Sequence, residues 1–136
     1  MTKFVGALFA ITIWVTASSA QEAEVIASGK QEFRRNCALC HGLNGKGDSV
    51  MVTLNLLADK PPDLTQLKKN NSGTFPFWQV YRIVDGREPV KGHGTPDMPI
   101  WGDLFSMQAE KGSLASETKA TERILNLVHY VQSLQK

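Results

Sequence analysis

Cys37-Ala38-Leu39-Cys40-His41 is the stretch that decides how the rest of this 136-residue chain is interpreted. It holds the only two cysteines of the sequence, separated by two residues, and a histidine directly after the second. Residues three apart are neighbours on a helix surface, so one turn of helix would bring both thiols and the imidazole together. The motif therefore predicts a site in which two sulfur atoms and one metal-binding nitrogen act on a single group.

Three kinds of site use cysteines at this spacing. Cys-x-x-Cys-His attaches c-type haem: the thiols of Cys37 and Cys40 add to the porphyrin vinyl groups, and the imidazole of His41 binds the iron. A thioredoxin-like dithiol is expected after a strand in a βαβ unit, and this motif follows a helical pattern. A zinc site would need His93 or His129 as its fourth ligand, with no second cysteine pair to match. We therefore expect one covalently bound haem c with its iron.

Helical periodicity lies on both sides of the motif. Apolar and small side chains at spacings of three and four predict helices over 25–36, 76–85 and about 118–134, and a short capped helix over 64–69. Asp63 is the expected cap of the short helix, and Gly86 follows residues 76–85 at the position of a left-handed cap. No segment alternates like a strand, so the expected fold class is all-α.

Two segments are expected to be loops. Glycines and an asparagine dominate residues 42–48, which indicates tight turns. Residues 87–102 carry three prolines and three glycines, which predicts a long shaped loop. Residues 49–60 fit either a short helix or an apolar loop, and both remain open.

The first twenty residues resemble a secretory signal peptide. Lys3 precedes an apolar run from Phe4 to Val15, and small or polar residues follow up to Ala20. A membrane anchor is the alternative, although the run is shorter than the roughly 20 apolar residues that a spanning helix needs. We expect residues 1–20 to be removed, residues 21–136 to form one domain, the mature form to have no membrane span, and the protein to be exported to the periplasm.

Composition and charge exclude one class of partner. The chain is 42% hydrophobic and 21% charged, which is typical of a globular protein, and its formal net charge is +2. Without the first twenty residues, whose only charged side chain is Lys3, 14 basic side chains stand against 13 acidic ones, and this balance gives no footprint of a nucleic-acid-binding protein.

Segments beyond the motif resemble the class I c-type cytochromes, in particular the monohaem proteins of the bacterial periplasm. They are Gly29-Lys30-Gln31-Glu32-Phe33, Pro61-Pro62-Asp63-Leu64, Gly94-Thr95-Pro96-Asp97-Met98-Pro99-Ile100-Trp101-Gly102 and Leu127-Val128-His129-Tyr130-Val131. The resemblance covers nearly all of residues 21–136. It implies several helices around one covalently attached haem, with the first and last helices crossing where Gly29 permits close approach.

The same resemblance implies a second ligand and its surroundings. In this family a methionine from a late loop binds the haem iron, and Met98 occupies the similar position in the proline- and glycine-rich loop. The competing donors are Met51, Met107, His93 and His129, and an open iron is a further alternative. The family also has a proline carbonyl that accepts a hydrogen bond from the iron-bound imidazole; Pro61 or Pro62 could serve, and a plain turn is the alternative.

The function that this resemblance implies is electron transfer without substrate chemistry. The protein would shuttle single electrons between periplasmic redox partners, such as a dehydrogenase, a reductase or an oxidase. Cys37, Cys40, His41 and Met98 would bind the haem, His41 and Met98 would bind its iron, and no residue would be catalytic. One alternative is a peroxidase or gas-binding protein with an open iron. Another is the haem subunit of one oxidoreductase complex.

Overall fold

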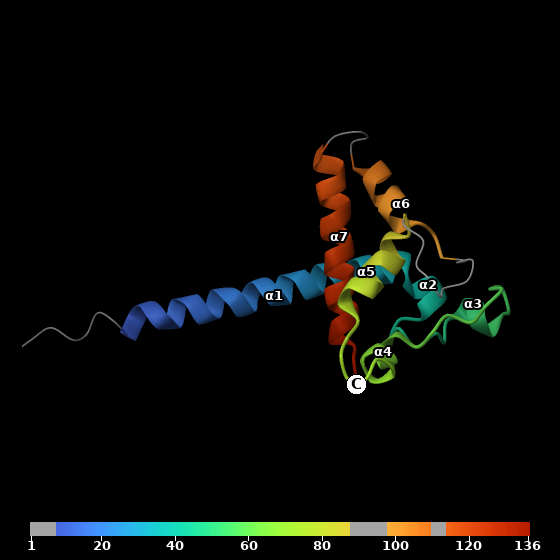
Figure 1. Ribbon diagram of the computed structural model, residues 1–136, viewed down its shortest axis with the longest axis horizontal. Helices are drawn as coiled ribbons and strands as arrows, with labels where there is room; N and C mark the ends of the chain where they lie inside the picture. The colour runs from blue at the N-terminus through green and yellow to red at the C-terminus, as the bar shows by residue number, and fades with distance from the viewer. Residues whose placement is uncertain (1–7, 88–97, 110–113) are drawn as a thin grey trace, which may run out of the picture.

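The computed structural model describes residues 8–87, 98–109 and 114–136, and this part of the chain contains helices and no strand. The elements are α1 Leu8–Asn36, α2 Ala38–His41, α3 Val50–Thr53, the 3-10 helix η1 Leu64–Gln66, α4 Leu67–Asn70, α5 Phe77–Asp85, α6 Trp101–Gln108 and α7 Leu114–Ser133. The predicted all-α class is confirmed. Figure 1 shows α5, α6 and α7 together at one end of the long helix α1, with α2 to α4 beneath them.

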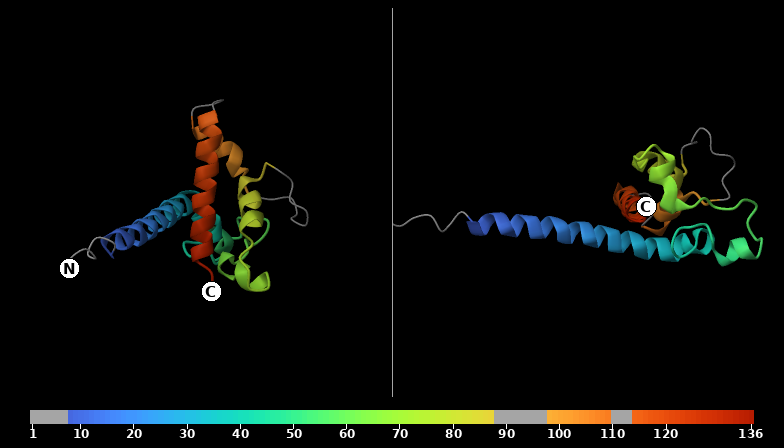
Figure 2. Two further views of the ribbon diagram at one scale, coloured as in Figure 1. Left: turned by 60° about the vertical axis from the view of Figure 1, so that its left-hand side comes forward. Right: turned by 90° about the horizontal axis from the view of Figure 1, so that it is seen from below.

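Helix α1 begins earlier than the sequence pattern predicts. The expected helix starts at residue 25, whereas α1 runs without a break from Leu8 to Asn36. Residues 16–28 contain neither proline nor glycine, so nothing ends the helix before the apolar face of the domain begins. Its first half projects away from the other helices (Figure 2). Cleavage after Ala20 stays a prediction, and within the described residues no helix has the length and apolar content to cross a membrane.

The core is built where α1 crosses α7. Gly29 lies against the backbone of α7, where a β-carbon would overlap the carbonyl group of Asn126. The rings of Phe33 and Tyr130 pack against each other at a tilt beside this crossing, with their centroids 5.3 Å apart. The expected close approach at Gly29 is therefore present. The largest fully buried side chains are Phe33, Phe105, Ile124, Leu127 and Val128.

Short-range sequence signals correctly predicted the ends of several shorter elements. Asp63 caps η1, because its carboxylate accepts a hydrogen bond from the Thr65 amide at 2.9 Å. Ser49 caps α3 within the segment that the sequence left open. Gly86 ends α5 in the left-handed conformation, as predicted.

Helix α6 is the element that the sequence analysis missed. The loop expected up to residue 102 ends earlier, since the helix begins at Trp101. Gly102 in its first turn argues locally against a helix, but Phe105 is completely buried and Arg123 of α7 lies over its ring at 3.7 Å from the centroid. Packing against α7 therefore stabilises a helix that its own sequence predicts weakly.

Candidate functional site

The cysteine motif forms one turn at the end of α1. The Cys37 amide still donates to the Phe33 carbonyl at 2.9 Å, and the amides of Cys40 and His41 both donate to the Cys37 carbonyl, at 3.1 and 2.9 Å. The two thiols and the imidazole are thus held by a single turn, as the spacing predicts. Core packing of Phe33 fixes the helix that leads into this turn.

Burial keeps the first thiol uncharged. Cys37 is 9% exposed, and burial, with smaller contributions from Glu32 and Cys40, raises its pKa to about 12. A redox dithiol needs a thiolate of lowered pKa, so this environment argues against a thioredoxin-like role. A thioether has no proton to lose and is readily buried. Both cysteines are free, as covalent attachment of a haem requires.

The imidazole of His41 is partly buried, and one of its ring nitrogens has no hydrogen-bond partner. Its Nδ1 atom is the one buried side-chain nitrogen or oxygen among the described residues that has no hydrogen-bond partner. Burial also lowers its pKa, which favours the neutral ring that binds metals. An unpartnered buried polar atom is unusual and points to a functional role. The residues of the motif therefore fit a covalently held haem whose iron takes an imidazole ligand.

The expected hydrogen bond from this imidazole to a proline carbonyl is not formed. The Pro61 carbonyl lies instead against Gly47, whose amide donates to the His41 carbonyl at 2.8 Å. Gly47 has φ +66°, and a β-carbon there would overlap the Pro61 oxygen. The segment around Pro61 is thus brought beside the motif by a glycine turn, through its backbone and without a hydrogen bond to the ring Nδ1.

Exposed apolar side chains are frequent in the motif and in the segment that follows it. Five of them, each about 60% exposed, come from α2, α3 and the turns beside them: Leu39, Leu43, Val50, Leu54 and Leu56. Exposed apolar patches mark interaction sites, so these side chains are candidates to cover a bound apolar group. A porphyrin ring needs such a surface, which the sequence analysis did not assign to these residues. The apolar residues within 49–60, whose pattern fitted either a short helix or a loop, were the sequence signal for this surface.

Met98 lies outside this turn, in the segment that leads into α6. Its side chain is half-buried, and α6 begins three residues later at Trp101. Figures 1 and 2 show this segment on the same side of the domain as α2. No hydrogen bond or ion pair of the described residues joins Met98 to the motif.

The competing donors are placed differently. Met107 is 51% exposed on α6, and Met51 is half-buried in α3. His129 is exposed on α7, where its ring packs on Phe77 with centroids 5.0 Å apart. His93 lies outside the described residues.

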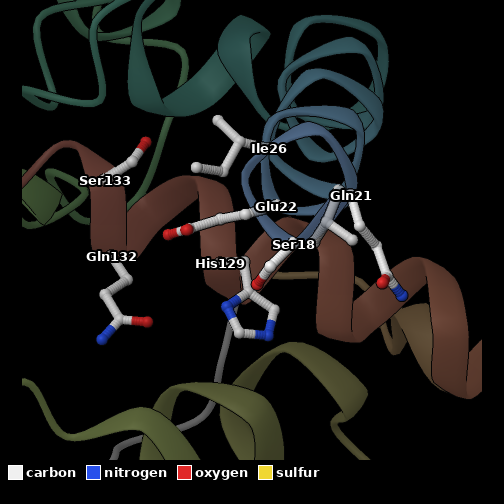
Figure 3. A pocket seen from close by; sticks show the side chains of 8 residues that line it. Ser18, Gln21, Glu22, Ile26, His129, Gln132 and Ser133 are labelled. Carbon is white, nitrogen blue, oxygen red and sulfur yellow. The ribbon is translucent and has the colours of Figure 1, made fainter. Parts of the chain in front are cut away.

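A separate groove between α1 and α7 does not belong to this site. Figure 3 shows Glu22 and His129 in it, and its volume is about 580 Å³. Its lining contains no residue of the motif, and among the described residues no group of three or more His, Cys, Asp or Glu side chains could hold a metal ion. The zinc alternative therefore has no support from the described part of the chain.

Comparison with known proteins adds a family match. Residues 26–135 match the family model described as Cytochrome c. The matched range contains the cysteine motif, Met98 and every element from α2 to α7. Comparisons with curated proteins and with solved structures gave no match.

Proposed function

Since the chain belongs to the cytochrome c family, which carries covalently attached haem c and transfers electrons, we propose that it is a single-electron carrier with iron ligands His41 and Met98. When bound, the haem iron supplies a one-electron change between its ferrous and ferric states. The observation that carries the proposal is the motif itself: two free cysteines and a partly buried imidazole with an unpartnered Nδ1 share one turn.

Each residue of the motif has a separate task in this proposal. Cys37 and Cys40 hold the group by thioether bonds, so it stays on the protein in both oxidation states. His41 offers a neutral imidazole, and the turn fixes its direction through the hydrogen bond from its amide to the Cys37 carbonyl. The exposed apolar side chains Leu39 of α2 and Val50 of α3 would cover part of the bound group and keep water from it, which favours the less charged state of the site.

Met98 supplies the thioether that completes the iron ligands. Pro99 directly after it disfavours helical geometry, and the backbone of Ile100 is extended, so Met98 lies before α6 and not in its first turn. A methionine ligand raises the reduction potential and leaves no position for oxygen or peroxide. This assignment favours an electron carrier over a peroxidase or gas-binding protein.

The finer functional setting also belongs to the proposal. Residues 1–20 act as a leader, and the mature protein, residues 21–136, works in the periplasm between redox partners such as a dehydrogenase, a reductase or an oxidase. Membership of the family implies redox partners. A dedicated haem subunit of one such complex is the second candidate, and stable co-purification with a single partner would favour it.

Redox titration of the purified holoprotein, combined with carbon monoxide exposure of the ferrous form, tests the proposal. We expect one reversible one-electron transition and no rapid binding of carbon monoxide, because Met98 occupies the iron. Rapid carbon monoxide binding by the unaltered protein would contradict an iron with both protein ligands in place. It would favour the peroxidase or gas-binding alternative.

A further inference from the structure

The junction between α5 and α6 contains an ion-pair network that the proposed function does not use. Arg87 follows the cap of α5, and its guanidinium lies 2.8 Å from the Asp85 carboxylate and 2.6 Å from the Glu117 carboxylate of α7. Ser106 of α6 donates to the other Glu117 oxygen at 2.7 Å. One guanidinium thus links α5 to α7, and one carboxylate links α7 to α6.

The network closes directly on the start of α6. A β-carbon at Gly102 would overlap the Asp85 carboxylate and the Arg87 Nε atom, so these groups lie against the first turn of the helix. Gly86 likewise lies against the backbone of Ile100, with 3.2 Å between its ideal β-carbon position and the Ile100 α-carbon. Figure 1 shows the end of α5 beside the beginning of α6. We call Asp85, Arg87, Gly102 and Glu117 the α5–α6 anchor.

Burial makes this anchor more than a surface ion pair. Asp85 is only 8% exposed, and the Arg87 guanidinium donates to it through Nε as well as through its terminal nitrogen. Without Arg87 the buried carboxylate would lose its charged partner, which destabilises this arrangement more strongly than loss of an exposed pair. The anchor therefore holds the start of α6 against α5 in one position.

Met98 stands four residues before Gly102, so the position of its backbone depends on this contact. We propose that Arg87 is a positioning residue for Met98: by clamping the start of α6, the α5–α6 anchor keeps the Met98 thioether on the iron. This inference rests on the proposed ligand role of Met98. Arg87 itself acts through Asp85 and Gly102 and touches no reacting atom.

Carbon monoxide binding to the ferrous holoprotein tests the inference, because the ligand enters only when Met98 leaves. Arg87→Gln removes the positive charge of the anchor. We expect carbon monoxide to bind about tenfold faster, which corresponds to weakening the anchor by about 1.4 kcal/mol. Arg87→Lys should restore part of the effect, since one amine can pair with Asp85 or Glu117 but cannot bridge both. If Arg87→Gln does not yield folded protein, Glu117→Gln leaves the Asp85 pair intact and should give a smaller acceleration.

Arg123→Gln is the matched control. Arg123 forms an ion pair with Glu32 at 2.9 Å, and it holds α6 through a hydrogen bond to Gln108 and a contact over the Phe105 ring. Both contacts lie in the second half of α6, so this variant loosens the helix away from its start. We expect it to lower the melting temperature while leaving carbon monoxide binding close to that of the parent protein. Equal acceleration by Arg87→Gln and Arg123→Gln would show a general loss of stability and would overturn the positioning role.

Met98→Ala separates the two ideas. If Met98→Ala accelerates carbon monoxide binding and Arg87→Gln does not, the ligand role of Met98 is supported and the inference about Arg87 fails. If Met98→Ala leaves carbon monoxide binding unchanged, the proposed function fails and the inference fails with it. Acceleration by Met98→Ala and by Arg87→Gln, but not by Arg123→Gln, supports both.

Discussion

Replacing Gly29 by alanine tests the helix crossing on which the haem-bearing turn depends. The added β-carbon would overlap the carbonyl oxygen of Asn126 and come within 2.9 Å of the Tyr130 β-carbon. The first obstacle is helix backbone, which cannot rotate away as a flexible side chain could. The two helices must therefore separate or slide, and the Phe33–Tyr130 contact must change with them.

Two opposing effects set the magnitude. Alanine in place of glycine stabilises a helix interior by about 1 kcal/mol. Overpacking in a well-packed core costs about 1–3 kcal/mol, and a backbone obstacle argues for the upper end. We expect a net loss of about 2 kcal/mol, which lowers the melting temperature of a domain of this size by roughly 8 °C.

Thermal unfolding of the holoprotein, followed by far-ultraviolet circular dichroism, measures this loss. Ala27→Gly is the matched control, because Ala27 is exposed on the same helix and should lose only about 1 kcal/mol of helix propensity. A Gly29→Ala protein as stable as the parent, or more stable, would refute the close approach of α1 and α7.

The remaining predictions concern attachment, processing and pH. Replacing both Cys37 and Cys40 by alanine should let acid-acetone extract the haem, because only thioethers make attachment covalent; haem retained by the double variant would exclude this site. The intact mass after export should equal residues 21–136 plus one haem, and a mature protein that still contains Met1 would contradict cleavage after Ala20. The pKa of Glu117 is lowered by hydrogen bonds, first from Arg87 and then from Ser106. Its ionised form therefore stabilises the fold at a pH above its unfolded pKa of about 4.3. This stabilisation is lost as the pH falls through the lower pKa of the folded state. Glu117→Gln should therefore flatten the acid limb of the stability curve, and an unchanged acid limb would contradict this assignment.

The sequence predicted the elements that short-range chemistry determines. Gly86 and Asp63 end and begin their helices as expected, because caps depend on a few neighbouring residues. The motif also forms the expected single turn, since its spacing alone brings the three side chains together. Gly29 differs, because its contact with α7 is long-range and was expected only from the resemblance to a family.

Long-range packing explains what the sequence did not predict. Helix α6 depends on the burial of Phe105 against α7, and nothing near Trp101 and Gly102 indicates that partner. The early start of α1 reflects a missing stop signal, since neither proline nor glycine stands between residues 16 and 28. The anchor formed by Asp85, Arg87 and Glu117 joins three helices, so no local motif could reveal it.

The reduction potential of Met98→Ala, measured beside its carbon monoxide binding, tests the central claim most directly. Removing the thioether should lower the potential and let carbon monoxide bind rapidly to ferrous protein, because methionine ligation favours the reduced state and occupies the iron. Met107→Ala, at a half-exposed position on α6, should change neither quantity. If Met98→Ala keeps the parent potential and excludes carbon monoxide while Met51→Ala or His93→Ala does not, Met98 is not the ligand.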